Sequence, residues 1–126
     1  NYCGGESPEG WVYLFNDICP GDTWQVPFWW KRFMEDPNWK KLIKNRWLEL
    51  RTNKFSNQNI LNKISNYTKY LIDNNSIQDN FNKWNILGKY IWPNYYIGTT
   101  YTDEITYLKD WVNRRLVWMD SQINNF

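Results

Sequence analysis

Apolar side chains recur with the 3.6-residue period of an amphipathic helix through most of the chain, from Thr23 onward. The clearest stripe lies in the segment 36–51, where Asp36 suits the N-cap and Pro37 suits the first helical position. Its apolar positions are Trp39, Leu42, Ile43, Trp47 and Leu50. The pattern therefore predicts a helix over 36–51.

The same period and similar start signals predict four more helices. They are a helix from Thr23 to residue 35, one from Ser56 to about residue 73, a shorter one opening at Ser76, and a long final one capped by Thr102. Between the last two, the segment 90–101 contains Pro93 and Gly98 and is predicted to be a non-helical loop rich in aromatic residues.

The first 23 residues are rich in glycine and proline, which forbids a long helix there. Within them, the apolar run 11–15 is predicted to be a strand or an extended segment. Cys3 and Cys19 bracket this run, so a disulfide is expected in an oxidising compartment, with two free thiols as the alternative. A metal site is not expected, because no other soft ligand accompanies them. The fold class predicted is mostly α: a single domain over 1–126, with a loop-rich segment 1–23 and about five helices in an orthogonal bundle over 24–126.

Composition narrows the possible functions. The chain has 126 residues and no histidine, which removes the commonest general base and any histidine-ligated metal. A net charge of +2 does not indicate nucleic-acid binding, and no run of about 20 apolar residues predicts a membrane span. Ten tryptophans and an aromatic fraction of 20% supply much apolar area for a small core, or for stacking on ligands.

Two arginines lie on otherwise apolar helix faces. At 100° per residue, Arg46 projects into the stripe of the 36–51 helix, and Arg115 lies between Trp111 and Trp118. An unpaired guanidinium there would be costly. We predict that both are structural, each largely buried beside an indole and bonded to an acid or to carbonyl groups. A ligand-binding arginine is the alternative for Arg46.

Two further groups of residues suggest binding or chemistry. Trp92, Tyr95 and Tyr96 in the aromatic loop form a possible platform for a glycan or a partner protein, or else the edge of the core. Four acids lie in the first loop, and a pair of carboxylates is what a glycosidase needs, although such acids are more often turn formers or caps. These acids are Glu6, Glu9, Asp17 and Asp22.

Two blocks of sequence resemble a known family. The first runs from Phe28 to Pro37 and on through the segment 46–51, and the second runs from Glu104 to Asp120 with Trp111, Arg115 and Trp118 at fixed spacing. In order and spacing they resemble the C-terminal helical part of the spore-coat-protein-H-like (CotH) kinase family, in the form found in secreted bacterial proteins. The resemblance covers roughly residues 3–123.

The resemblance implies an atypical protein kinase that binds ATP with a divalent metal such as Mg²⁺ and phosphorylates serine or threonine. In that family the nucleotide-binding strands and catalytic acids lie upstream of the region matched here. The chain is therefore expected to be the back half of a kinase-like domain, with no catalytic, cofactor-binding or metal-binding residues of its own. Its expected partner is the missing N-terminal lobe, with a protein substrate or a glycan as further possibilities, and its expected location is secreted or at the cell surface. Exposed apolar area would also allow self-association. The alternative is an aromatic-lined module of a secreted bacterial protein that binds a glycan or a protein.

Overall fold

The computed structural model describes residues 3–126, and all regular structure in that range is helical. A 3₁₀ helix (Val12–Leu14) precedes six α-helices: α1 (Phe15–Ile18), α2 (Phe28–Glu35), α3 (Pro37–Arg51), α4 (Asn57–Asp73), α5 (Ser76–Lys83) and α6 (Tyr101–Ile123). The mostly helical class is therefore confirmed. The prediction of a strand or extended segment over 11–15 was wrong, because this run forms the 3₁₀ helix and the start of α1.

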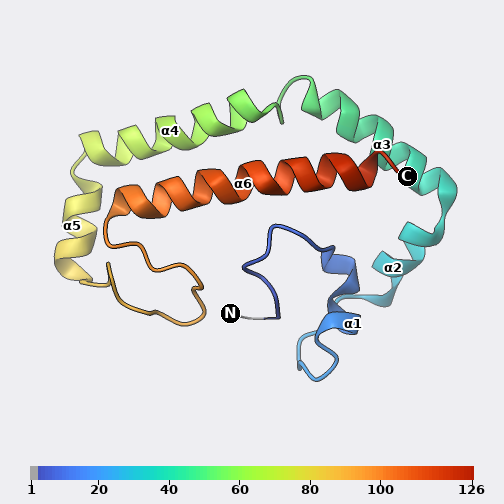
Figure 1. The fold of residues 1–126 in the computed structure, drawn as a ribbon, viewed down its shortest axis with the longest axis horizontal. Coiled ribbons are helices and arrows are strands. Elements are labelled where there is room, and N and C mark those ends of the chain that lie inside the picture. The colour runs from blue at the N-terminus through green and yellow to red at the C-terminus, as the bar shows by residue number, and fades with distance from the viewer. Residues whose placement is uncertain (1–2) are drawn as a thin grey trace.

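Helix α6 is the element around which the others lie (Figure 1). Helices α2 to α5 follow one another in an open arch, in which α4 runs alongside α6 and α3 meets its C-terminal end. The N-terminal segment lies on the opposite side of α6 from α4. This open arch differs from the orthogonal bundle expected from the sequence.

The predicted helix starts hold where local signals are strong. Asp36 accepts a hydrogen bond from the backbone N–H of Asn38 at 2.8 Å, and Ser56 accepts one from Asn59 at 3.3 Å. Helix α2, however, begins at Phe28 and not at Thr23. The segment before Pro27 is not helical because the side chain of Asn16 pairs with the backbone of Val26.

Asn16 holds the segment before α2. Its side-chain amide donates to the carbonyl of Val26 at 2.9 Å, and its side-chain oxygen accepts from the N–H of Val26 at 2.8 Å. Both backbone groups of Val26 are thus occupied, and the residue is buried. This pairing ties the end of the loop before α2 back to α1, which contains Asn16. The final helix shows a smaller shift, since its N-cap is Thr100 and not Thr102.

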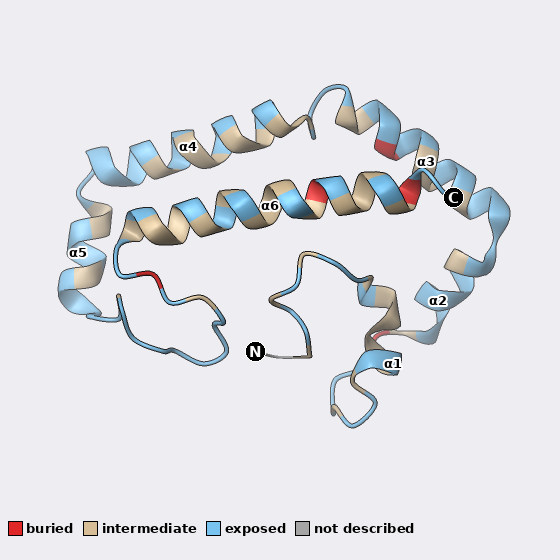
Figure 2. Cartoon of the chain, in the orientation of Figure 1, coloured by how far each residue is buried: buried red, intermediate tan, exposed pale blue. Residues whose placement is uncertain are grey.

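The hydrophobic core is small (Figure 2). Among the described residues, the buried apolar side chains are those of Val26, Trp47, Leu116 and Ile123. The last three form one cluster where α3 crosses the C-terminal half of α6. Many large apolar side chains on α2, α3 and the aromatic loop remain exposed. The described chain therefore exposes many more large apolar side chains than it buries.

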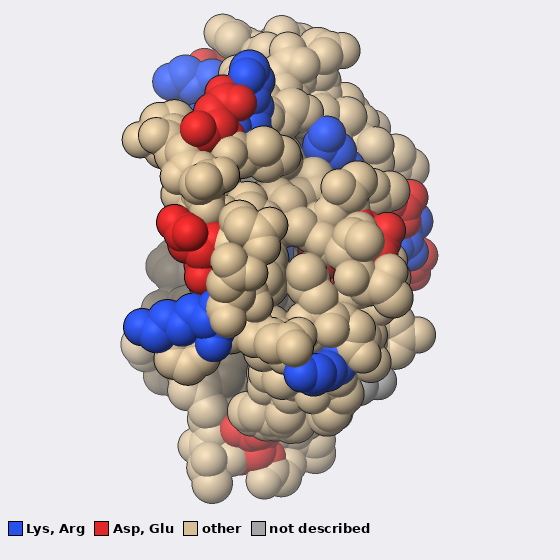
Figure 3. All heavy atoms as spheres, turned by 90° about the vertical axis from the view of Figure 1, so that its left-hand side faces the viewer, with Lys and Arg blue, Asp and Glu red and all other residues tan. Residues whose placement is uncertain are grey.

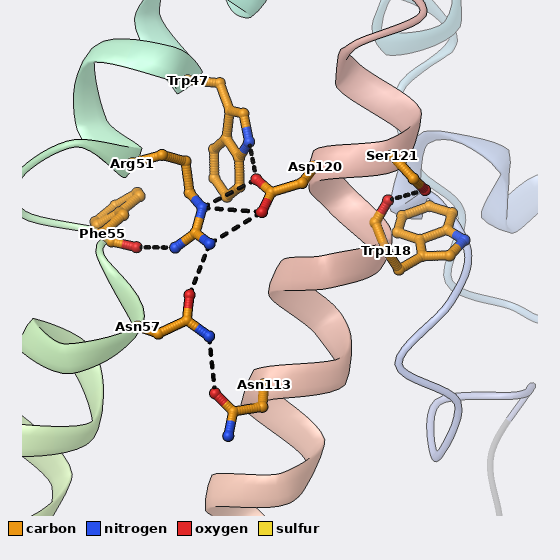
Figure 4. A network of polar contacts seen from close by, with 8 residues as sticks. All are labelled: Trp47, Arg51, Phe55, Asn57, Asn113, Trp118, Asp120 and Ser121. Atoms are coloured by element: carbon orange, nitrogen blue, oxygen red, sulfur yellow. Dashed lines mark hydrogen bonds and ion pairs between the residues drawn. The ribbon is translucent and has the colours of Figure 1, made fainter.

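A polar network fastens α3 and α4 to α6 (Figure 4). Asp120 on α6 accepts hydrogen bonds from the Trp47 indole N–H at 2.8 Å and from the Arg51 Nε at 2.9 Å. Arg51 also donates to the carbonyl of Phe55 and to the side-chain oxygen of Asn57. Asn57 in turn donates to the side chain of Asn113 at 3.0 Å. The connector between α3 and α4 is thereby fixed against α6.

Candidate functional site

The N-terminal end of α6 is closed by a capping box. The Thr100 hydroxyl accepts from the N–H of Asp103 at 3.1 Å, and the Asp103 carboxylate accepts from the N–H of Thr100 at 2.8 Å. The Thr99 hydroxyl also donates to Asp103, at 2.7 Å. These hydrogen bonds, that from Thr99 first, lower the pKa of the Asp103 carboxyl below its ordinary value. The aromatic loop thus enters α6 in a fixed direction.

Gly98 provides the second attachment of the aromatic loop. Its N–H donates to the Glu104 Oε1 at 2.6 Å, and its carbonyl accepts from the N–H of Gly88 at 2.9 Å. A Cβ atom at position 98 would lie 2.7 Å from the same Glu104 oxygen, which is too close for a carbon atom. Only glycine therefore allows this carboxylate to approach the loop backbone so closely.

A cleft of about 600 Å³ lies between the aromatic loop, the first half of α6 and the N-terminal segment. Tyr96 stacks on Tyr107 of α6 with ring centroids 4.2 Å apart and the rings nearly parallel. On the other side, the Trp111 indole N–H donates to the backbone carbonyl of Glu6 at 2.8 Å. The volume is in the range of small-ligand sites. The lining is Gly5, Glu6, Pro93, Asn94, Tyr95, Tyr96, Glu104, Ile105, Tyr107, Leu108 and Trp111.

The platform predicted in the aromatic loop is divided by the structure. Tyr95 and Tyr96 line the cleft, with Tyr95 exposed and Tyr96 half-buried against Tyr107. Trp92 does not line it, and 69% of its surface is exposed to solvent. Uncharged residues cover most of the molecule's surface at the α5 end (Figure 3).

Sequence reasoning missed the residues that α6 adds to the cleft. Glu104, Tyr107, Leu108 and Trp111 follow the i, i+3, i+4, i+7 spacing of one helix face. This spacing could have grouped them. No such spacing places Glu6 at the cleft, because its backbone carbonyl accepts a hydrogen bond from the indole of Trp111, 105 positions away along the chain.

The acids of the first loop do not form one site. Asp17 accepts from Lys31 at 2.7 Å, an interaction that raises the pKa of the Lys31 ammonium, and Asp22 accepts from the N–H of Trp24 at 2.7 Å. Of the four, only Glu6 lines the cleft. Its Oε2 is a buried oxygen without a hydrogen-bond partner within the described structure.

Arg115 holds the N-terminal segment. Its guanidinium donates to the carbonyls of Pro8 at 2.8 Å and Gly10 at 2.7 Å. It also lies over the rings of Trp118 and Trp11, at 4.7 and 5.8 Å from their centroids. Partial burial lowers the pKa of this guanidinium from its ordinary value. The whole set of contacts joins the N-terminal segment to the middle of α6.

Arg46 lies at the surface of α3 and not in the buried position that was expected. Its side chain is 61% exposed and pairs with Glu49 one turn further along α3. The expectation that it is largely buried was therefore wrong. The groove beside Arg46 is open to solvent, and the arginine that makes the half-buried ion pair with α6 is Arg51. The Cys3–Cys19 disulfide, in contrast, is present as predicted.

The described residues include no close group of three or more carboxylates for Mg²⁺, and the aromatic cleft has no cationic lining for ATP. In residues 3–126, Cys3, Cys19 and Asp22 are the one group of three or more such side chains near enough to share a metal ion, but the two sulfurs are joined to each other. Mg²⁺ prefers oxygen ligands, and only Asp22 of this group supplies them. The aromatic cleft is lined by Glu6 and Glu104 and by no lysine or arginine, so its charge opposes a triphosphate.

Comparison with models of known families shows to which family the chain belongs. The model of the family described as CotH kinase protein matches residues 9–119. The chain belongs to the CotH kinase protein family. The match extends from the N-terminal segment through most of α6, so it includes the helices α1 to α5 and the α6 side of the cleft, whereas Glu6 precedes it. No curated protein and no solved structure matches the chain. None of the helices in residues 3–126 is both long and apolar enough to cross a lipid bilayer.

Proposed function

We propose that this chain is the helical portion of a CotH-like protein kinase homologue of a bacterial surface or secreted protein. In this proposal the groups that bind ATP and Mg²⁺ and transfer phosphate to a protein lie upstream, and the helices support them. The observation that carries the proposal is the family match over 9–119, which spans α1 to α5 and most of α6. The sequence adds support, because it has no histidine and no glycine-rich phosphate loop.

The gene gives a direct test. Reading its 5′ side from the codon for Asn1 should reveal a nucleotide-binding lobe with paired acidic metal ligands. A signal peptide directly before Asn1 would contradict the proposal, because no part of the mature protein could then lie upstream of Asn1.

Titration calorimetry with ATP and MgCl₂ tests the proposal on the chain itself. Phosphoryl-transfer sites bind nucleotide through groups aimed at phosphate and metal, and the charge of the cleft is unsuited to this. The expected result is no micromolar binding. Micromolar binding that is lost in Glu6→Gln or Asp22→Asn, and kept in Glu49→Gln on the exposed side of α3, would place a nucleotide site in this chain.

A second candidate function is glycan binding in the aromatic cleft. The observation that favours it is the combination of Tyr95, Tyr96 and Trp111 with the carboxylates of Glu6 and Glu104. The C–H face of a sugar ring packs on an aromatic ring, and its hydroxyl groups donate to carboxylates. The same cleft would also accept an aromatic or polar segment of a partner protein.

Calorimetry with soluble chitohexaose and cellohexaose tests this second candidate. Binding should weaken at least tenfold in Tyr95→Ala and remain unchanged in Tyr70→Ala, which removes an exposed tyrosine of α4 that does not line the cleft. Equal losses in both variants would exclude the cleft as the binding site, and no binding of either oligosaccharide would exclude these glycans as ligands.

A further inference from the structure

The aromatic cleft carries negative charge that its own lining does not neutralise. Glu6 and Glu104 line the cleft, and no lysine or arginine does. Neither glutamate forms an ion pair within residues 3–126. Two carboxylates that face a cleft without a basic partner attract a cation and repel an anion. The sign of this charge therefore limits which ligands the cleft accepts.

Glu6 is the more weakly satisfied of the two carboxylates. Its Oε2 is buried and accepts no hydrogen bond within the described structure, although the residue as a whole is only half-buried. A carboxylate oxygen that leaves water without gaining a donor costs free energy, and a positive charge beside the carboxylate offsets that cost. The backbone carbonyl of Glu6 accepts from the Trp111 indole, which keeps this residue beside the aromatic lining.

Glu104 brings the second carboxylate to the cleft from α6. Its Oε1 accepts from the N–H of Gly98 at 2.6 Å, where the loop backbone lies too close for a Cβ atom. This hydrogen bond fixes the position of the carboxylate. A peptide N–H is uncharged, however, so the contact leaves the negative charge in place. A cationic ligand in the cleft thus meets one carboxylate from the N-terminal segment and one from α6.

The lining combines this charge with aromatic surface. Tyr96 stacks on Tyr107, and Tyr95 and Trp111 also line the cleft. Aromatic rings pack on the C–H faces of a sugar ring, and they also attract cations. A lysine side chain brings a positive charge without a ring face, whereas a neutral sugar brings a ring face without a charge. A sugar with a protonated amino group brings both.

We propose that the aromatic cleft binds amino sugars whose amine is not acetylated. The ammonium group lies beside the carboxylates of Glu6 and Glu104, and the sugar ring packs against the aromatic lining. This inference rests on the glycan-binding candidate described above and narrows it to cationic sugars. The same two carboxylates disfavour glycans that carry carboxylate, sulfate or phosphate groups, because like charges repel.

Two hexasaccharides that differ only in acetylation test the proposal. Hexaglucosamine has free amines, whereas every amine of chitohexaose is acetylated. In calorimetry in mildly acidic buffer, where the sugar amines are protonated, hexaglucosamine should bind the chain at least tenfold more tightly. Equal binding of both sugars would overturn this proposal and leave the glycan-binding candidate in place. Binding of neither sugar would overturn both.

Charge-removing variants locate the ammonium group. Glu6→Gln and Glu104→Gln should each weaken hexaglucosamine binding at least fivefold, and any binding of chitohexaose should stay within twofold. Glutamine at position 104 keeps an oxygen for the N–H of Gly98, so the loop attachment is retained. Glu9→Gln is the matched control, because Glu9 is exposed in the same N-terminal segment and does not line the cleft. Circular dichroism checks that each variant is folded.

Two further results would overturn the proposal. An equal loss of hexaglucosamine binding in Glu9→Gln would show that the sugar responds to overall charge and not to the cleft. A hexalysine peptide that binds as tightly as hexaglucosamine and displaces it would show that positive charge alone is recognised, without the sugar ring.

Discussion

The guanidinium of Arg51 and the carboxylate of Asp120 face each other across the α3–α6 contact. Nε lies 2.9 and 3.2 Å from the two carboxylate oxygens, and the second guanidinium nitrogen lies 2.9 Å from one of them. The two side chains are 18% and 35% exposed, so the pair is partly shielded from water. This geometry holds together two helices that are remote in sequence.

Replacing Arg51 with alanine should destabilise the fold by about 2–3 kcal/mol, because it leaves the Asp120 carboxylate partly buried with only the Trp47 indole as donor. Arg46→Ala is the control on the same helix, and it should cost at most about 0.5 kcal/mol because its pair with Glu49 is exposed. Urea denaturation measures both values. Equal costs would show that the Arg51 network does not fasten α3 to α6.

Replacing Arg115 with alanine should cost about 2 kcal/mol, because two carbonyls lose a charged donor and two indoles lose their cation. Arg115→Met should cost less, since methionine keeps the packing between the rings. Hydrogen exchange should become faster in the segment 6–11. The neighbouring Arg114→Ala, which removes only an exposed pair with Asp110, should leave that segment unchanged. Slow exchange in all three variants would argue against this anchor.

Reducing the Cys3–Cys19 disulfide should lower the free energy of unfolding by about 3 kcal/mol in the chain-entropy model. Faster hydrogen exchange should be confined to the described residues up to Val26, because Asn16 ties the loop to both backbone groups of Val26. A Cys3→Ser, Cys19→Ser variant should show the same exchange with or without reductant. A uniform increase through α4 and α6 would contradict the prediction.

The capping box at Asp103 should make the start of α6 sensitive to acid. Hydrogen bonds from Thr99 and Thr100 lower the pKa of this carboxyl in the folded state. Its contribution to stability is therefore complete above the unfolded value of about 3.9 and is lost as the pH falls through the folded value. Carboxyl-carbon NMR titration should show the Asp103 pKa moving up toward its ordinary value in Thr99→Val. An unchanged pKa in that variant would exclude Thr99 as the main cause.

The sequence predicts those features whose signals are local. The start of α3 follows from Asp36 and Pro37, and the start of α4 follows from Ser56, because a cap interacts with its own first turn. The disulfide follows from two cysteines in one loop-rich segment. The start of helix α2 could not be predicted in this way, because the side chain of Asn16 pairs with both backbone groups of Val26, ten positions further along the chain.

Contacts between remote segments are what the sequence does not predict. Periodicity places Arg46 in the apolar stripe of α3, but only the packing of α3 on α6 decides that Arg51 is the arginine that meets a carboxylate. The cleft also depends on contacts between segments that are remote in sequence. Tyr95 and Tyr96 were visible as aromatic loop residues, whereas Glu6 and Trp111 meet only because the N-terminal segment lies against α6.

Side chains of helix α6 hold the N-terminal segment through hydrogen bonds to the backbone carbonyls of that segment. Trp111 donates to the carbonyl of residue 6, and Arg115 donates to the carbonyls of residues 8 and 10. A carbonyl oxygen is present whichever amino acid occupies the position. In evolution, positions 6 and 8 are therefore free to change their side chains while the segment stays in place, provided that the indole and the guanidinium of α6 are kept. Position 10 is restricted to glycine by its φ of 106°. The wall that this segment adds to the cleft can thus acquire new chemistry without a new fold.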